Sequence, residues 1–404
     1  MKCYVCDQED WHALRGVHPS ALLQVCKSCG NVAIDVGPAD AAAMEAYYRS
    51  EYRRAPVAKN IVQAFSKRYM ISGFMAEFLA GKRGLKCLDI GAGTGFWPAW
   101  LVSQGHDAGG VELALGFRRF AHHYYGLDLA ERIDPEQRYD LISLWHVLEH
   151  LTEPDQRLQG YVDSLAPGGR LLVSVPEWFR YVAMAGYGPV TDFAGYFAKD
   201  HINVFSGQSL KNLFAKVGLV IEKEDHVIQG QTYLLRPVSD GEPVPERVAE
   251  DWQAQVERVM TIKGAIIAHR DGRSRDAVDL WPAFPEPWLA LIDTHKGNPQ
   301  AKAELYTECE PFVGDHMLYR WSRAQWHFWN ERYEQAAEDA RWVCSRSPQG
   351  GVVRLLVELE VKHLGRPQAA LKYLRMLMDL DPDAFSKHID LFIRLAAKAP
   401  FAGE

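Results

Sequence analysis

The sequence predicts an α/β protein with an open, mostly parallel, Rossmann-like sheet, a small metal-binding segment before it and an all-helical domain after it. Three observations carry this prediction. Two Cys-x2-Cys pairs lie near the N-terminus, strand and helix signals alternate from about residue 84 to 237 around a glycine-rich turn, and a weak helical repeat follows. The 404 residues suffice for two or three domains of roughly 100–200 residues each.

The composition is typical of soluble globular proteins, with 48% hydrophobic and 24% charged residues. A formal net charge of −7 argues against nucleic acid as a partner, since domains that bind phosphate backbone tend to be basic. No stretch approaches the ~20 apolar residues of a membrane span, and the N-terminus lacks an apolar signal segment. We therefore expect a cytoplasmic protein without a membrane span.

The first element is a zinc ribbon over residues 1–35, built on Cys3, Cys6, Cys26 and Cys29. In a cytoplasmic chain this spacing indicates a metal site rather than disulfides. Four thiolates can surround Zn²⁺ with no open position, which is a structural arrangement. So short a segment cannot bury a sufficient core, and the metal would supply the missing folding energy. The alternatives are two coincidental cysteine pairs or a redox pair.

A mostly helical stretch over 39–80 leads into the alternating region, where apolar runs bounded by glycines predict buried parallel strands with helices on both faces. The expected strands are 84–91, 108–113, 139–144, 170–176, 219–227 and 231–237. The expected helices are 97–104, 116–125, 156–165 and 206–217, the last capped by Ser206 and ended by Gly218.

Residues 237–282 are expected to be a linker and a helix, because prolines, a glycine and charges cluster at 236–248. Residues 283–404 are expected to be helical throughout. Three residue pairs within this region are each 34 residues apart: Pro348 and Pro382, Ala336 and Ala370, and Val343 and Leu377. This period and its closing proline resemble tetratricopeptide repeats, which implies a protein partner, and the alternative is an irregular helical bundle.

The strongest functional signal is the segment LDIGAGTGF at 88–96. It is not the dinucleotide fingerprint G-x-G-x-x-G, because its third glycine comes one residue early. A glycine-rich turn between a strand and a helix lets a ligand approach the backbone at the carboxyl edge of the sheet. Asp89 adds a carboxylate at the strand end, and Glu112, 23 residues later, can accept both hydroxyls of a ribose.

These motifs, at this order and spacing over about residues 60–236, resemble the class I S-adenosylmethionine-dependent methyltransferases. The resemblance implies a seven-stranded sheet in a core domain over 36–236, with S-adenosylmethionine as the cofactor. The cofactor-binding residues that it implies are Asp89, Gly91, Ala92, Gly93, Gly95, Phe96, Glu112, Leu113, Trp145 and His146. The family usually has a third strand ending in a polar residue beside the adenine. Here only a short segment takes that place, with Asp128 as a stand-in.

Methyl transfer requires an aligned nucleophile, and a hydroxyl or carbon acid must also lose a proton. Histidine titrates near neutrality, so His146, His150 and His201 are the candidate general bases. If 146–151 begins a helix, His146 and His150 share one face beside Glu149, and a divalent metal site is an alternative. The aromatic insertion at 176–205 can stack on a sugar or pack as a lid, and the histidines can equally be structural.

The cysteine pairs, the tyrosines at 47, 48 and 52, and the His201-x3-Phe205-Ser206 segment resemble bacterial enzymes of surface-polysaccharide and sugar modification. The resemblance implies O- or C-methylation of a sugar, a glycan or a similar small polar acceptor. The fourth strand lacks the Asn/Asp-Pro-Pro-aromatic tetrapeptide of base N-methyltransferases of this fold. The alternatives are a protein or RNA acceptor recruited by the ribbon and the repeats, and a non-catalytic scaffold that binds a partner.

Overall fold

A computed structural model describes residues 1–18, 21–35, 43, 46–49, 58–176, 201–227 and 230–397. Tyr52 and the part of the aromatic insertion at 177–200 lie outside the described residues. The chain divides into two compact units. The first comprises Met1–Val57 and Ala76–Trp281, and the second comprises Ala58–Met75 and Pro282–Glu404.

The cysteine-rich segment forms a small antiparallel sheet of order β1-β2-β3-β8. Its own three strands are β1 (Trp11–Leu14), β2 (Leu23–Cys26) and β3 (Val32–Ile34), and the fourth, β8 (Asn203–Val204), comes from far along the chain. Residues 23–26 and 32–34 are all buried, and Cys26 and Ala33 belong to one hydrophobic cluster with the core of the large sheet. The ribbon is therefore part of the first unit's core.

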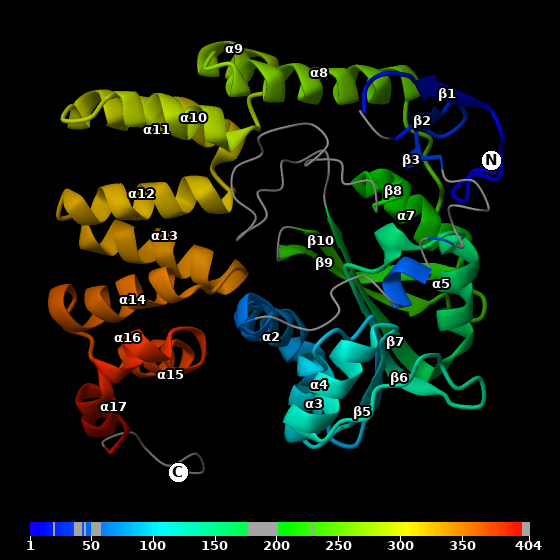
Figure 1. Ribbon diagram of the computed structural model, residues 1–404, viewed down its shortest axis with the longest axis horizontal. Helices are drawn as coiled ribbons and strands as arrows, with labels where there is room; N and C mark the ends of the chain where they lie inside the picture. Colours follow the sequence, from blue (N-terminus) through cyan, green and yellow to red (C-terminus); the bar gives the residue numbers. More distant parts are fainter. Residues whose placement is uncertain are drawn as a thin grey trace. The chain divides into compact units, whose positions relative to one another are not determined.

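The large sheet (Figure 1) contains the six strands predicted from the apolar runs. Their order is β5-β4-β6-β7-β10-β9. Its first four strands are parallel, and β10 runs antiparallel between β7 and β9. The strands are β4 (Lys86–Ile90), β5 (Asp107–Val111), β6 (Tyr139–Trp145), β7 (Leu165–Pro176), β9 (Leu219–Val227) and β10 (Gly230–Pro237). Strands β4 and β6 and the second half of β7, residues 171–176, are almost wholly buried, as covering helices on both faces require.

The sheet has six strands among the described residues, rather than the seven expected. At the β5 edge, a single parallel bridge joins Val111 to Ala130. The segment between α4 and β6 is short, and among the described residues it forms this one bridge with the sheet. In place of a seventh strand, the described residues thus have a single bridge at the β5 edge.

Helices α3 (Phe96–Ser103) and α4 (Leu115–Tyr125) lie on one face of the sheet, and α5 (Pro154–Asp163) and α7 (Gly207–Lys216) lie on the other (Figure 1). The expected start and end of the last helix are confirmed. The Ser206 hydroxyl accepts the backbone N–H of Ser209 at 2.9 Å, and Gly218 follows with φ 69°.

The expected linker has no helix or strand between β10 and α8 (Trp252–Arg270), but hydrogen bonds hold its last part in place. Arg247 donates to the Val5 carbonyl at 3.2 Å, and the Asn212 side chain makes two hydrogen bonds with the Val248 backbone. A second helix, α9 (Ser274–Leu280), completes this unit. The linker therefore contacts the ribbon at one residue and α7 at the next.

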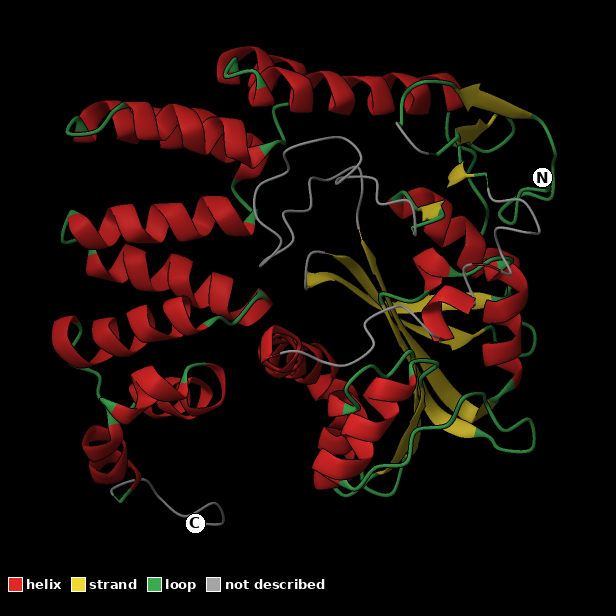
Figure 2. Cartoon of the chain, in the orientation of Figure 1, coloured by secondary structure: helices red, strands yellow, loops and turns green. Residues whose placement is uncertain are grey.

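Every described element of the second unit is helical (Figure 2). Its helices are the first part of α2 (Ala58–Leu79), α10 (Pro285–Thr294), α11 (Pro299–Val313), α12 (Met317–Trp329), α13 (Tyr333–Arg346), α14 (Gly350–Glu358), α15 (Ala370–Leu380), α16 (Pro382–Ser386) and α17 (Ile389–Ala396). A π-helical turn, Leu359–His363, follows α14. None of the described helices is both long and apolar enough to cross a membrane.

Residues that are 34 positions apart in the sequence occupy equivalent positions in the helix pairs of this unit. Ala336 on α13 and Ala370 on α15 are both fully buried, and α12 packs against α13 as α14 packs against α15. The residues Ala58–Met75 of α2 join the same unit, where the Tyr69 hydroxyl donates to Asp379 at 2.5 Å. The repeat interpretation agrees with this pairing and stays a prediction.

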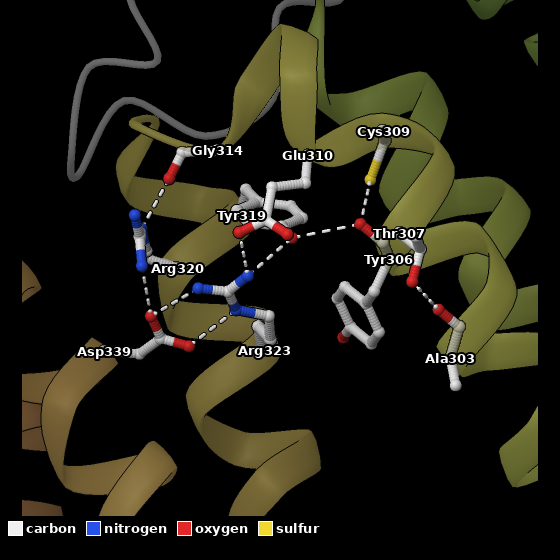
Figure 3. A network of polar contacts seen from close by, with 10 residues as sticks. All are labelled: Ala303, Tyr306, Thr307, Cys309, Glu310, Gly314, Tyr319, Arg320, Arg323 and Asp339. Carbon is white, nitrogen blue, oxygen red and sulfur yellow. Dashed lines mark hydrogen bonds and ion pairs between the residues drawn. The ribbon is translucent and has the colours of Figure 1, made fainter.

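A buried carboxylate holds α12 against α13 (Figure 3). Asp339 is 2% exposed and accepts Arg320 Nη1 at 2.8 Å and Arg323 Nε at 2.7 Å. Arg323 also donates to Glu310 on α11 at 2.5 Å. The two guanidinium groups compensate the charge of a carboxylate that has left water, so the network is intolerant of losing one member.

We expect Asp339→Ala to destabilise the helical unit by about 3 kcal/mol, because two partly buried arginines lose their shared anion. Urea unfolding of the full-length protein, followed by circular dichroism, measures the change. The matched control is Glu334→Ala on the same helix, whose partner Arg366 is exposed, and it should cost less than about 1 kcal/mol. Equal losses in the two variants would contradict this role for Asp339.

Candidate functional site

The glycine turn after β4 requires glycine for two separate reasons. Gly91 and Gly95 have φ of 67° and 76°, in the left-handed region that side chains disfavour. A Cβ on Gly91 would lie 2.6 Å from Val147 Cγ2, and one on Gly95 would lie 2.8 Å from Ala121 Cβ. The turn thus brings the backbone close to the loop after β6 on one side and to α4 on the other.

Glu112 follows β5 and reaches back to this turn. Its carboxylate accepts the N–H of Gly93 at 2.8 Å and the N–H of Ala114 at 2.8 Å. Burial raises the pKa of Glu112, and these two hydrogen bonds counteract that rise. A carboxylate has about four lone-pair sites, so the fixed group retains capacity to accept hydroxyls.

The remaining predicted cofactor residues lie along the same edge of the sheet. Asp89, 6% exposed near the end of β4, accepts the hydroxyl of Ser143 on β6 at 2.6 Å. Trp145 ends β6 with 8% exposure, and its indole N–H has no hydrogen-bond partner among the described residues. Ala92, Leu113 and His146 occupy the turns that follow β4, β5 and β6, and Phe96 is the first residue of α3. The expected adenine stand-in, Asp128, is instead exposed and paired with His122 at 2.7 Å.

These features fit S-adenosylmethionine. Glycines that leave no room for a Cβ, a carboxylate held beside them and a buried indole donor suit a polar ligand with a ribose at this edge. The assignment of individual residues to the cofactor stays a prediction.

A helix at 146–151, which was the condition for a metal site with His146 and His150 on one face, does not form. His146 has φ 55°, and only a 3-10 turn, Leu148–His150, follows. The Asn203 side chain donates hydrogen bonds to the carbonyls of Leu148 and Leu151, at 3.1 and 2.8 Å, and so competes with helical hydrogen bonds there. The next helix, α5, starts at Pro154. His146 and His150 therefore do not share one helix face.

A different cluster forms in its place, from Glu149, His150 and His201. One ligand atom of each lies within 4.8 Å of the others, and the two imidazole centroids are 4.5 Å apart. His150 Nε2 lies 3.8 Å from a carboxylate oxygen of Glu149, which is fully buried. The Tyr48 hydroxyl lies 2.8 Å from His150 Nδ1. Tyr48 was not predicted as a site residue, because the tyrosine pattern marked only a resemblance.

The environment favours a neutral imidazole at His201. Burial lowers the pKa of His201 well below its usual 6.5, and the charges of His150 and His146 act in the same direction. A neutral imidazole can take a proton at neutral pH. One carboxylate and two imidazoles are also a set that can bind a divalent metal with an open position. The cluster is therefore suited to general-base or metal-assisted chemistry.

The four cysteines of the ribbon converge on one point. Cys3 Sγ lies 3.7 Å from Cys29 Sγ, and Cys6 Sγ lies 3.6 Å from Cys26 Sγ. These distances are too long for disulfides at about 2.05 Å. They match the edge of a sulfur tetrahedron, about 3.8 Å, around a zinc with bonds of about 2.3 Å. The residues therefore fit a structural Zn²⁺.

The thiol chemistry agrees with this. The hydrogen bond from Cys29 lowers the pKa of Cys26, and the hydrogen bond to Cys26 raises the pKa of Cys3. Without a cation, one thiolate thus opposes ionisation of its neighbours. A bound Zn²⁺ would stabilise all four thiolates together.

Comparison with known proteins identifies the class of the core. A family model described as a methyltransferase domain matches residues 62–224. The chain thus contains an S-adenosylmethionine-dependent methyltransferase domain, an N-terminal cluster of four cysteines and a C-terminal helical region.

Individual relatives are distant. The ubiquinone biosynthesis O-methyltransferase of Idiomarina loihiensis is 25% identical over 130 residues, which cover 28% of this chain and 53% of that protein. The protein of the same name from an Azoarcus species is 25% identical over 105 residues, covering 23% and 45%. The chain thus spans about half the length of these curated relatives. The magnesium protoporphyrin IX methyltransferase of Synechocystis, solved with S-adenosylhomocysteine, has 15% identity and a TM-score of 0.37, covering 48% of this chain and 97% of that one.

We expect the purified full-length protein to contain about one zinc per chain, because four convergent thiolates form a closed tetrahedral site. Elemental analysis measures the ratio. Cys26→Ser should lower it towards zero, whereas Cys344→Ser, which removes a buried thiol from α13, should leave it unchanged. Zinc near zero in the native protein would contradict the assignment.

We expect Glu112→Gln to weaken S-adenosylhomocysteine binding about tenfold, because a charged acceptor beside the glycine turn becomes neutral. Calorimetry on zinc-loaded protein gives the two dissociation constants. Glu136→Gln, an exposed acid in the same unit, is the control and should bind like the native protein. Unchanged affinity in Glu112→Gln would remove Glu112 from the cofactor site.

Proposed function

We propose that the protein is an S-adenosylmethionine-dependent methyltransferase that methylates a hydroxyl or carbon of a sugar, a glycan or a similar small polar acceptor. The observation that carries the proposal is the contact of two sites at one sheet edge. Gly91 of the cofactor turn lies against Val147, and Val147 immediately precedes the turn that bears Glu149 and His150. A methyl donor and a proton acceptor can therefore serve one nucleophile.

Bound S-adenosylmethionine supplies a methyl group on a sulfonium, which is already activated for transfer. The protein has to orient the nucleophile and accept its proton as the new bond forms. We assign the proton to His201, because its buried imidazole is neutral at pH 7. His150, held by Tyr48 at one nitrogen and facing Glu149 at the other, is the second candidate base.

Several features favour a small polar acceptor. The ribbon and the His201–Phe205–Ser206 segment resemble enzymes of sugar modification, and the curated relatives are O-methyltransferases by name. The net charge of −7 disfavours RNA.

A second candidate function is methylation of a protein or RNA recruited by the ribbon and the helical repeats. The paired helices of the second unit, with Ala336 and Ala370 buried at equivalent positions, favour a macromolecular partner. A third is a non-catalytic scaffold. Transfer of labelled methyl groups separates the three: the proposal expects label in a panel of nucleotide-linked sugars. Label in protein or RNA alone supports the second function, and no label together with no cofactor binding supports the third.

We expect His201→Ala to lower kcat by about 10²–10⁴-fold and to leave S-adenosylhomocysteine affinity unchanged, because the residue would serve the acceptor. The labelled-methyl assay and calorimetry measure the two quantities. His123→Ala, an exposed histidine on α4, is the control. Because a base works when deprotonated and the pKa of His201 is lowered, the acid limb of kcat should lie below pH 6.5. Equal activity in His201→Ala, or a limb above pH 6.5, would contradict the assignment.

A further inference from the structure

The strand β8 belongs to the ribbon's sheet, although it lies far from the ribbon in sequence. Ala33 pairs with Asn203 and Val32 with Val204, and the N–H of Ile34 donates to the Ile202 carbonyl at 2.8 Å. All the residues of this pairing are at most 3% exposed. The pairing therefore fixes the backbone of 202–204 to the strand that directly follows the second cysteine knuckle.

Asn203 extends from this strand to the turn after β6. Its side-chain amide donates to the Leu151 carbonyl at 2.8 Å and to the Leu148 carbonyl at 3.1 Å, and the Glu149 carbonyl lies at 3.4 Å. The side chain is 2% exposed, so these hydrogen bonds form away from water. The backbone carbonyls of Leu148, Glu149 and Leu151 thus all accept hydrogen bonds from one amide group.

The same few residues carry the acceptor-side groups. Glu149 and His150 lie within the turn that Asn203 holds, and His201 lies two residues before Asn203 on the strand side. One amide thereby fixes both halves of the cluster relative to each other. It holds His201 through its own chain, and it holds the Glu149–His150 pair through the carbonyl groups of Leu148 and Leu151 on either side of them.

We propose that Asn203 is a positioning residue, which transmits the order of the zinc ribbon to the Glu149, His150 and His201 cluster. The inference rests on the proposed function, since it concerns the groups assigned to the acceptor. Under this proposal the ribbon helps to position the Glu149, His150 and His201 side chains, in addition to its role in folding. The cofactor turn, which Asn203 does not contact among the described residues, is supported separately by β4, β5 and Glu112.

The test compares Asn203→Leu, which keeps the volume and removes the donor, with Asn212→Leu in the full-length, zinc-loaded protein. Asn212 is the matched control: it is also 2% exposed, but its side chain bonds to Val248 of the linker at 2.7 and 2.9 Å and to Gln208 on the same helix at 3.0 Å. The readouts are the imidazole NMR signals of His150 and His201 at fixed pH 7.5, and calorimetric S-adenosylhomocysteine affinity.

We expect Asn203→Leu to shift both imidazole signals and to leave cofactor affinity within about twofold, whereas Asn212→Leu leaves the signals in place. Asn203→Gln, which keeps an amide donor, should return the signals towards their native positions. If Asn203→Leu does not fold, Asn203→Ser is expected to give the same shifts, because a hydroxyl cannot reach the carbonyls. Native signals in the Leu or Ser variant, or equal shifts in Asn212→Leu, would overturn the inference.

Failure of the proposed function has a different signature. It would appear as absent S-adenosylhomocysteine binding or absent methyl transfer by the native protein, whatever the Asn203 variants do to the imidazole signals.

Discussion

The pairing of β3 with β8 is the constraint on which the acceptor side of this protein depends. It is short, with two residue pairs, yet it joins a cysteine-rich ribbon to a methyltransferase sheet. The buried backbone of an edge strand must find partners, and each of the two strands supplies them to the other. From this junction the polar contacts run through Asn203 to the turn that bears Glu149 and His150.

The cofactor side has an independent basis. Parallel strands bring their carboxyl ends to one edge, so the glycine turn, Glu112 and Trp145 meet there without help from the ribbon. Left-handed glycines allow close packing of the turn against Val147 and Ala121, and backbone N–H groups fix the Glu112 carboxylate. Different elements thus hold the glycine turn and the Glu149, His150 and His201 cluster, and the two meet at Val147.

Local signals in the sequence predicted most of the architecture. Cysteine spacing, apolar runs, the Ser206 cap and the glycine turn each depend on residues close in sequence, and the structure has all of them. Contacts between distant segments were not predictable in the same way. The pairing of β8 with the ribbon, the approach of Tyr48 to His150 and the place of Ala58–Met75 in the helical unit all depend on long-range packing. The turn at 148–150 depends on such a contact too, because a side chain 52 residues away bonds to the Leu151 carbonyl. The seventh strand was expected from the family resemblance, and in its place the described residues have one parallel bridge, between Val111 and Ala130.

Hydrogen exchange of the full-length protein before and after removal of zinc by a chelator tests the central claim most directly. If the ribbon supports the acceptor side alone, exchange should rise in residues 23–34, 147–151 and 201–205 and stay unchanged in 86–113. Unchanged protection at 147–151, or loss of protection throughout 86–113, would contradict the account.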